Sequence, residues 1–402
     1  MLSVNLKRVM IIAGESSGEL YGAFLAGTLK KHNPEISIIG VGGDRMQAAG
    51  VELVSRISSS FGIIEAIKTY GEIKKTFQKV VAALKSFRPQ ALVLIDYPEF
   101  NIKVAGEAKE LGIKVLYYVS PQVWAWRSGR VRVIGRVVDK MAVVLPFESE
   151  IYSKANIPCE FVGHPVLDEF EEILQGMGFS ILDIGSQDLK SKARKELGLM
   201  PDKPVIAFMP GSRYHEVTKL LPVMYNVTTS VKKLYPDYQF AIPIAPNLEK
   251  SLFAGYSLME NCHLIKGESA KALMASDFAV IASGTSTLQA ALLKVPMVIV
   301  YKLSPLSYFI GRLVVKVKYI SLVNILLEKS VKDDSGLRIK ELLQDDENEE
   351  KIMAELTKII DGSKYRDGMI QQLEKVKNMF ITERASLKVA EMVEKLGVQG
   401  NV

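Results

Sequence analysis

Short apolar runs separated by helical patterns recur along most of the chain. In the first half these runs are Val9–Ala13, Ile36–Val41, Ala91–Ile95, Lys114–Val119 and Met141–Leu145. Each run has the length of a buried strand, and strands that alternate with helices indicate a parallel sheet covered on both faces. The first half is therefore predicted to form a doubly wound α/β domain that binds its ligands at the carboxyl ends of its strands.

The same alternation restarts after a polar, glycine-rich region that follows Gly163. The second set of runs is Val205–Met209, Phe240–Pro243, Cys262–Ile265, Phe278–Ala282 and Met297–Val300. Beyond Asp345 the pattern is helical to the end. We predict an α/β protein with two doubly wound, Rossmann-like domains, 1–165 and 166–379, that face each other across a cleft. The last helix, within about 380–402, either closes the second domain or crosses back onto the first.

The segment Ala279–Tyr301 shows the strand–helix–strand pattern most clearly. Its turn, Ser283-Gly284-Thr285, carries small and hydroxyl side chains and opens a helix. Free backbone N–H groups and the positive end of the helix dipole make such a turn a natural anion site. An ordinary helix capped by Thr285 or Ser286 explains the same pattern.

A second loop of this kind follows Val205–Met209 and reads Pro210-Gly211-Ser212-Arg213. Gly211 lets the backbone approach a ligand, and Arg213 offers a fork of donors to a diphosphate. Two such loops at neighbouring strand ends favour nucleotide-diphosphate binding by the second domain. The chain has no Asp-x-Asp pair and no histidine pair with metal-ligand spacing, so we expect helix N-termini and Arg213, rather than a metal, to stabilise a leaving diphosphate.

The first domain offers a different chemistry at its strand ends. Glu15 occupies the first strand–helix loop, where its carboxylate would repel a phosphate, although a helix N-terminal acid is an equally simple role for it. Asp96 follows an apolar strand and precedes Pro98, so it is a candidate general base or else a helix cap. Trp124 and Trp126 fit either the wall of a sugar or acyl pocket or an interdomain packing plug.

Composition narrows these possibilities only a little. The 402 residues are 48% hydrophobic and 24% charged, as in soluble globular proteins. The net charge of +6 suits anionic small molecules or an anionic membrane face, though a value this small is also common and uninformative, and no basic block indicates a nucleic-acid arm. The distant Cys159 and Cys262 predict neither a disulfide framework nor a zinc site, which points to a reducing cytosol. We expect no signal peptide and no membrane span.

The segment Phe61–Phe87 carries an apolar stripe that includes Ile67, Ile73 and Phe77, with most of its lysines off the stripe. A core-facing amphipathic helix explains the pattern, and a basic amphipathic surface that touches lipid is the alternative.

With these loops in view, the chain closely resembles the lipid-A-disaccharide synthase family, inverting glycosyltransferases of the GT-B fold. The shared motifs run almost from end to end. They are AGESSGELYGA at 13–23, VGGDRMQAAG at 41–50, FGIIEAI at 61–67, IDYPEFN at 95–101, YVSPQVWAWRSGR at 118–130, LPFE at 145–148, FVGHPVLDE at 161–169, MPGSRYHEV at 209–217, ASGTSTLQAALLKVPMVIVYKLSPL at 282–306 and YISLVNIL at 319–326.

The resemblance implies a reaction and a set of roles. The sugar of UDP-2,3-diacylglucosamine would pass to the 6-hydroxyl of 2,3-diacylglucosamine 1-phosphate, giving the lipid A disaccharide 1-phosphate and UDP, with no cofactor or metal. Asp96 would deprotonate the acceptor and Arg213 would hold the diphosphate. The UDP site would comprise Gly211, Ser212, Arg213, Ser283, Gly284, Thr285, Thr287, Gln289 and Asn324. The acceptor pocket would comprise Glu15, Ser16, Ser17, Asn101, Ser120 and Trp124.

The family also implies a setting. Its members are peripheral membrane proteins, so we expect this chain in the cytoplasm, on the inner face of the cytoplasmic membrane, with domain 1–165 on the acceptor and membrane side. This strengthens the lipid-facing interpretation of Phe61–Phe87. No nucleic acid is expected as a partner, and a homodimer is possible.

Three departures from the family pattern and three other functions remain. Gln289 replaces a usual Glu that commonly holds the ribose hydroxyls in GT-B enzymes, Glu99 replaces a usual Asp, and the piece Val331–Lys340 is longer than usual. The alternatives are a UDP-sugar epimerase of the same fold, another lipid glycosyltransferase, and a two-domain binding protein without catalysis.

Overall fold

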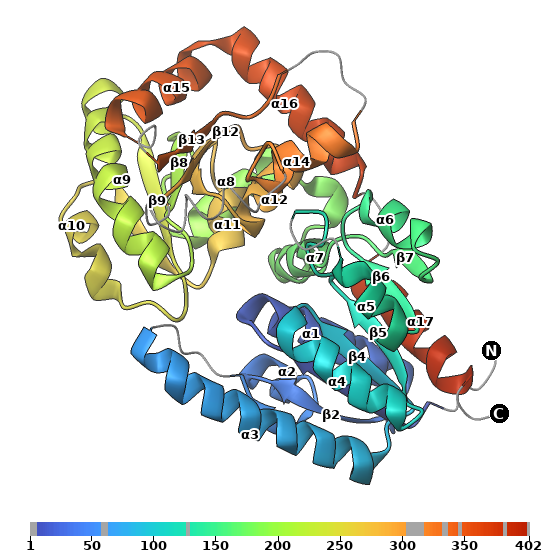
Figure 1. The fold of residues 1–402 in the computed structure, drawn as a ribbon. Coiled ribbons are helices and arrows are strands. Elements are labelled where there is room, and N and C mark those ends of the chain that lie inside the picture. Colours follow the sequence, from blue (N-terminus) through green and yellow to red (C-terminus); the bar gives the residue numbers. More distant parts are fainter. Residues whose placement is uncertain are drawn as a thin grey trace. The chain divides into compact units, whose positions relative to one another are not determined.

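The computed structural model describes residues 6–57, 63–125, 129–302, 317–331, 337–344, 348–380 and 384–399, and of these it leaves out the side chains of residues 16, 63–70 and 399. The chain divides into two compact units (Figure 1). The first unit is Met1–Asp168 together with Thr382–Val402, and the second is Glu169–Ile381. The acceptor-side and UDP-side roles assigned to the two halves stay predictions.

The described part of the first unit contains a seven-stranded parallel sheet in the order β3-β2-β1-β4-β5-β6-β7. Its strands are β1 (Arg8–Ala13), β2 (Ser37–Gly42), β3 (Glu52–Arg56), β4 (Ala91–Ile95), β5 (Lys114–Tyr118), β6 (Lys140–Val143) and β7 (Cys159–Phe161). Its helices are α1 (Ser16–His32), α2 (Asp44–Ala48), α3 (Ile63–Phe87), α4 (Pro98–Glu110), α5 (Arg130–Val137), α6 (Glu148–Lys154) and α17 (Ala385–Gln399). Every residue of β4 is buried, as a central strand covered on both faces requires.

The described part of the second unit repeats this plan with six parallel strands in the order β10-β9-β8-β11-β12-β13. The strands are β8 (Val205–Met209), β9 (Gln239–Ile244), β10 (Cys262–Lys266), β11 (Phe278–Ala282), β12 (Met297–Tyr301) and β13 (Glu341–Leu343). The helices are α8 (Gln187–Glu196), α9 (Tyr214–Leu234), α10 (Ala254–Ser257), α11 (Ser269–Met274), α12 (Thr285–Leu292), α14 (Leu322–Lys329), α15 (Glu349–Asp361) and α16 (Ser363–Asn378), and α7 (Val166–Met177) continues from the first unit into this one.

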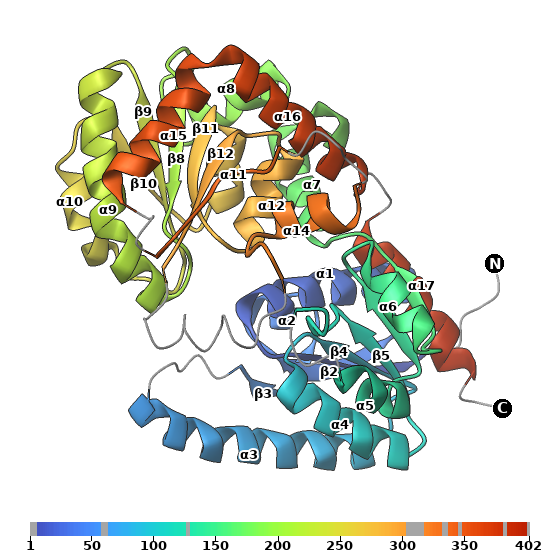
Figure 2. The same cartoon turned by 45° about the horizontal axis from the view of Figure 1, so that its top comes forward.

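Of the two places that the sequence left open for the last helix, α17 occupies the first unit. It contacts α1, β4 and β5 (Figure 2). His32 Nδ1 and Glu394 Oε1 lie 2.9 Å apart, and the hydroxyl and amide of Ser386 both donate to Asp168. The first sheet is thus completed by residues from the far end of the chain.

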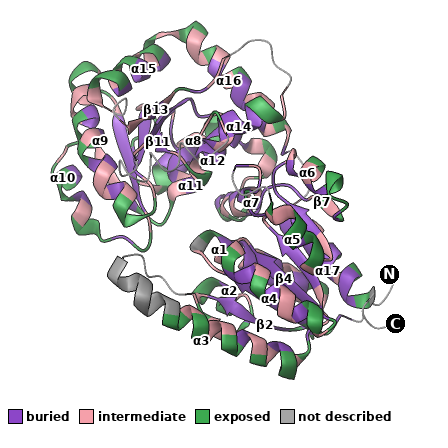
Figure 3. Ribbon diagram, viewed as in Figure 1, coloured by how far each residue is buried: buried purple, intermediate pink, exposed green. Residues whose placement is uncertain are grey.

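The described side chains of α3 resolve the two interpretations of its apolar stripe. Val80 and Leu84 are fully buried, and Ile73 and Phe77 pack against the same hydrophobic core. Figure 3 colours the described part of α3 by burial. The Phe77 ring meets the Phe100 ring edge-on, with centroids 5.9 Å apart. For residues 71–87 the stripe faces the core, so the expectation of a lipid-facing stripe is wrong there, while the side chains of 61–70 lie outside the described residues. Among the described helices, none combines the length and the apolar character that crossing a membrane requires.

Candidate active site

Asp96 lies at the carboxyl end of β4 in an unusual backbone conformation. Asp96 and Tyr97 have φ angles of 48° and 47°, in the left-handed region that residues other than glycine rarely adopt. The Asp96 carbonyl accepts hydrogen bonds from Asn101 Nδ2 at 2.8 Å and Tyr117 Oη at 2.5 Å, and its amide donates to the Tyr118 carbonyl. Strained backbone of this kind costs about 1–3 kcal/mol per residue and persists only where neighbours hold it, which is common at active sites.

The loop that carries Glu15 lies against the Asp96 loop. A Cβ atom on Gly14 would sit 2.2 Å from Cγ of Tyr97, so only glycine permits this approach. Burial, and then the Glu15 carboxylate, raise the pKa of Tyr97. Glu15 is the N-cap residue of α1, Ser17 is exposed, and the Ser16 side chain lies outside the described residues. Asn101 is fully buried, so it supports the Asp96 backbone from within.

Ser120 and Trp124, from the loop after β5, meet at a carboxyl group that the sequence analysis missed. Glu148 Oε1 accepts from Ser120 Oγ at 2.6 Å and from Trp124 Nε1 at 3.0 Å, and Oε2 accepts from the Leu145 amide at 3.1 Å. Glu148 is 1% exposed, and this burial raises its pKa to about 7 although the hydrogen bonds oppose the shift. Its only signal in the sequence was its place in the LPFE motif, directly after a strand.

In the second unit the Gly211 loop packs beside the end of β11. A Cβ atom on Gly211, whose φ is +110°, would lie 2.9 Å from Oε2 of Glu216 and 3.7 Å from Cβ of Ala282. Ser212 is exposed, and its carbonyl accepts a hydrogen bond from Asn247. Glycine is therefore required where the turn comes closest to the neighbouring strand.

Arg213 is the N-cap residue of α9, and its side chain is 48% exposed. Its Nη1 lies 3.6 Å from Oε1 of Glu216, so the guanidinium is turned along the first turn of its own helix. Burial raises the pKa of Tyr301, at the end of β12; the Glu216 charge adds to this and the Arg213 charge opposes it. The guanidinium is thus at the same strand edge as the end of β12.

The Ser283-Gly284-Thr285 turn directly follows β11 and leads into α12. The Ser283 amide donates to the Val300 carbonyl, and Thr287 Oγ1 donates to the Gly284 carbonyl at 2.8 Å. Gly284, the N-cap of α12, and Thr285 are exposed, and no side chain caps the helix. Because β8 pairs with β11, and β11 with β12, the two predicted anion loops follow adjacent strands at one edge of the sheet.

Two of the residues predicted to bind UDP are buried and form hydrogen bonds within the second unit. Gln289 is 6% exposed, and its Nε2 donates to Oε2 of Glu169 at 2.9 Å. Asn324 is fully buried, exchanges hydrogen bonds with the backbone of Ile339 and donates to Glu341. Glu341 also accepts from the Ser321 hydroxyl at 2.6 Å. A direct contact of Gln289 or Asn324 with UDP stays a prediction.

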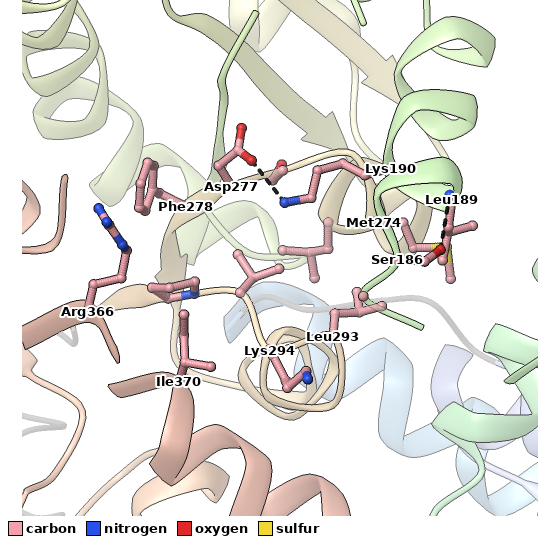
Figure 4. A pocket seen from close by; sticks show the side chains of 15 residues that line it. Ser186, Leu189, Lys190, Met274, Asp277, Phe278, Leu293, Lys294, Arg366 and Ile370 are labelled. Atoms are coloured by element: carbon pink, nitrogen blue, oxygen red, sulfur yellow. Dashed lines mark hydrogen bonds and ion pairs between the residues drawn. The ribbon is translucent and has the colours of Figure 1, made fainter. Parts of the chain in front are cut away.

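A cavity of about 380 Å³ lies at the amino ends of β11 and β12, away from the carboxyl ends that carry the two predicted anion loops (Figure 4). Asp277 in its wall binds Lys190 at 2.9 Å and Arg194 at 2.6 Å, and Lys294 binds Glu374 at 2.8 Å. These ion pairs link α8 to the residue before β11 and α16 to the connection between α12 and β12, and we assign no ligand to this cavity.

Comparison with known proteins supplies the remaining findings. Residues 9–393 match the family model described as lipid-A-disaccharide synthetase. The chain is 39% identical over 399 residues to the lipid-A-disaccharide synthase of Geobacter sulfurreducens, covering 98% of both chains. It is 36% identical over 392 residues to that of Coxiella burnetii (strain Dugway 5J108-111), covering 97% of this chain and 98% of the other.

Solved structures of low identity share the fold. The UDP-GlcNAc 2-epimerase of Neisseria meningitidis bound to UDP-GlcNAc superposes with a TM-score of 0.64 at 13% identity, covering 96% of this chain and 100% of that one. The calicheamicin glycosyltransferase CalG4 gives a TM-score of 0.61 at 12% identity, covering 99% and 100%. The predicted α/β fold with two Rossmann-like domains of the GT-B type is confirmed.

Proposed function

Since the chain belongs to the lipid-A-disaccharide synthase family and is therefore a glycosyltransferase of lipid A biosynthesis, we propose how its residues carry out that reaction. The sugar of UDP-2,3-diacylglucosamine is transferred to the 6-hydroxyl of 2,3-diacylglucosamine 1-phosphate, with inversion and release of UDP. A single displacement of this kind needs a base for the incoming hydroxyl and a site that stabilises the leaving diphosphate. We assign the base to the first unit and the diphosphate site to the second.

Asp96 is the proposed base. The observation that carries this role is the pinned, left-handed backbone at Asp96, held by Asn101 and Tyr117 at the carboxyl end of a central strand. That is the edge of a parallel sheet where ligands bind. A base held in place before the substrate arrives spends no free energy on its own ordering during the reaction.

The proposed diphosphate site consists of Arg213 and the first turn of α12. Arg213 supplies a fixed positive charge, and the uncapped turn after Gly284 supplies free N–H groups and the positive end of a helix dipole. Both lie at the carboxyl edge of the second sheet, on loops that follow adjacent strands. This supports a site in which Gly211, Ser212, Ser283, Thr285 and Thr287 form the surrounding backbone and hydroxyl groups.

The proposed acceptor pocket surrounds the Asp96 loop in the first unit. The loops that carry Glu15 and Ser120 follow β1 and β5, and these strands pair with β4 on its two sides. Trp124 presents an indole from the β5 loop. Asn101 belongs to this pocket as a support for Asp96, since it is fully buried.

We propose that the protein works on the inner face of the cytoplasmic membrane, because its substrates carry acyl chains. Over residues 71–87 the apolar stripe of α3 packs on the core, so the basic outer face of this part of the helix is the better candidate for membrane contact. That face carries the exposed lysines Lys74, Lys75, Lys79 and Lys85. A homodimer stays a prediction, which light scattering during size-exclusion chromatography would test.

The test of the reaction uses purified protein with the donor and the acceptor together. We expect UDP release that requires both lipid substrates, and formation of a disaccharide 1-phosphate by mass spectrometry. UDP-N-acetylglucosamine in place of the acylated donor serves as the control. Epimerisation of that control sugar, with no disaccharide from the lipid pair, would overturn the proposal in favour of an epimerase.

A further inference from the structure

Glu148 joins the loops that follow two neighbouring strands of the first sheet. The loop after β5 contributes the donors of Ser120 and Trp124, and the loop after β6 contributes the Leu145 amide. Strands β5 and β6 pair directly, so their loops emerge side by side. One carboxyl group therefore sets the spacing between two segments that are distant in sequence.

The burial of this carboxyl group makes its partners indispensable. An unpaired polar or charged group buried at 1% exposure would destabilise the fold by several kcal/mol, and the three donors offset much of this. Burial likewise raises the pKa of Tyr152, whose ring is fully buried beside the same group. Loss of one oxygen of Glu148 leaves a buried donor without a partner, so the β5 loop has to move.

The β5 loop is also strained where it leaves the strand. Val119 has a φ of +61°, although β-branched residues almost never adopt this conformation. The following residue, Ser120, is the one that donates to Glu148. Such a conformation relaxes unless neighbours hold it, and the short hydrogen bond from Ser120 is one of the contacts that does so.

Two contacts give the indole of Trp124 a defined orientation. Its Nε1–H points to Glu148, and its ring meets Phe147 edge-on, with centroids 5.3 Å apart and planes at 84°. The residue keeps partial exposure. Because the Asp96 amide donates to the Tyr118 carbonyl, the loop with Trp124 leaves the sheet beside the loop with Asp96.

We propose that Glu148 is a positioning residue for acceptor binding: it orients Trp124 and Ser120 so that the indole packs against the apolar face of the acceptor sugar next to Asp96. This inference rests on the proposed function, since it assumes that the acceptor binds in the first unit. The indole supplies apolar area and a polar handle, a combination that suits the C–H face of a pyranose ring. Glu148 itself does not touch the substrate.

The test compares Glu148→Gln with Glu150→Gln, an exposed position on the same helix that pairs with Lys154. Glutamine keeps the shape of Glu148, but its single acceptor oxygen cannot serve all three donors. We expect KM for the acceptor to rise about tenfold in Glu148→Gln, the effect of about 1.4 kcal/mol from a lost hydrogen bond. The donor KM and, to within about threefold, kcat should stay unchanged, and Glu150→Gln should match the wild type.

A second comparison isolates the role of Trp124. Trp124→Phe removes the N–H and keeps an aromatic ring, so we expect it to add little to the acceptor KM of Glu148→Gln. In a Trp126→Phe background Trp124 is the one remaining tryptophan, because the chain has two. Glu148→Gln should shift its emission to longer wavelength, and Glu150→Gln should not. A cooperative unfolding transition well above the assay temperature would show that each variant is folded.

The outcomes separate the two proposals. A wild type without turnover removes the proposed function, while the Trp124 emission still decides whether Glu148 orients this residue. An active wild type with an unchanged acceptor KM in Glu148→Gln overturns the positioning role. Equal losses for acceptor and donor would also overturn it, because they indicate general destabilisation.

Discussion

Gln289 donates a hydrogen bond to Glu169 inside the second unit, from Nε2 to Oε2 at 2.9 Å. A neutral donor therefore faces the carboxylate of Glu169. A second carboxylate in its place would put two negative charges in contact, and one of them would have to take up a proton. Gln289 and Glu169 are therefore matched, and neither is free to change alone.

We expect substitutions of Gln289 and Glu169 to be coupled in their effect on stability. Gln289→Glu should reduce the free energy of unfolding by about 1–3 kcal/mol at neutral pH, because a buried hydrogen bond becomes a repulsive contact. Adding Glu169→Gln restores one donor and one acceptor, so the double variant should recover most of the loss. Urea unfolding of all four proteins measures this coupling, and additive losses would contradict it.

Asp96→Ala should reduce kcat by about 10²–10⁴-fold, the range for loss of a general base. Binding of UDP should survive, because Arg213 and the α12 turn lie in the other unit. Stopped turnover with calorimetrically normal UDP binding is the expected pattern. The exposed Asp202→Ala provides the control. Wild-type turnover in Asp96→Ala would exclude Asp96 as the base.

Arg213→Ala should weaken UDP binding by about 100-fold, since one preorganised charged donor at a developing anion is worth roughly 3–4 kcal/mol at most. Titration calorimetry with UDP measures the change. Lys233→Ala, an exposed cation at the far end of the same helix, should bind UDP normally. Equal affinities for the two variants would remove Arg213 from the diphosphate site.

Because of the buried His164, we expect the first unit to lose stability at acidic pH. Burial lowers the pKa of His164 to about 3, and its Nδ1 accepts from the Val166 amide. Below its usual pKa near 6.5 the unfolded chain binds a proton that the folded chain does not, so stability falls as the pH drops from about 6.5 toward 3. Between pH 7 and pH 5 the wild type should lose about 2 kcal/mol more than His164→Asn.

The measurement for His164 is urea unfolding at both pH values, followed by tryptophan fluorescence. Trp124 and Trp126 both belong to the first unit, so the signal reports on the correct unit. Glu148, whose raised pKa acts in the opposite direction between about 4.5 and 7, is present in both proteins and cancels. His215→Asn changes an exposed histidine and should behave as the wild type does. An identical loss in His164→Asn would refute the prediction.

Because the outer face of α3 carries several exposed lysines, we expect it to bind anionic membranes in a salt-dependent way. Reversal of the charges at Lys74, Lys75, Lys79 and Lys85 to glutamate should reduce cosedimentation with phosphatidylglycerol vesicles, because each basic residue near an anionic surface contributes about 1 kcal/mol. Vesicles of phosphatidylcholine should bind both proteins weakly. The same number of exposed lysines of the second unit, Lys195, Lys233, Lys250 and Lys266, provides a control with equal net charge. Equal effects of the two sets would mean that net charge, rather than this face, drives binding.

The sequence predicts the central strands well because they are continuously apolar. Strand β4 is an example, buried at every residue. The strands it missed, β3, β7 and β13, lie at sheet edges and include half-exposed or exposed residues, so they leave no unbroken apolar run. Edge strands pair on one side, and their sequences carry a correspondingly weak signal.

In the candidate site, too, some features could be predicted from the sequence and others could not. The positions of Asp96, Gly211 and Gly284 just after strands were predictable, because these strands are continuous apolar runs; their roles at the ligand-binding ends of the strands stay predictions. The partnerships of Glu148 with Ser120 and of Gln289 with Glu169 were not predictable, since they join residues 28 and 120 positions apart. A single sequence indicates which residues follow the strands but not which distant carboxyl group contacts them.

Because α17 belongs to the first unit, that unit can be completed only after the second unit has been synthesised. Val389, Ala390 and Val393 of this helix are fully buried, and the helix contacts β4 and β5, the strands beside which the proposed base is held. A nascent chain thus carries an uncovered face of its first sheet while the whole second unit is being translated. A stop codon before residue 385 would deprive the earliest-made half of its last covering helix.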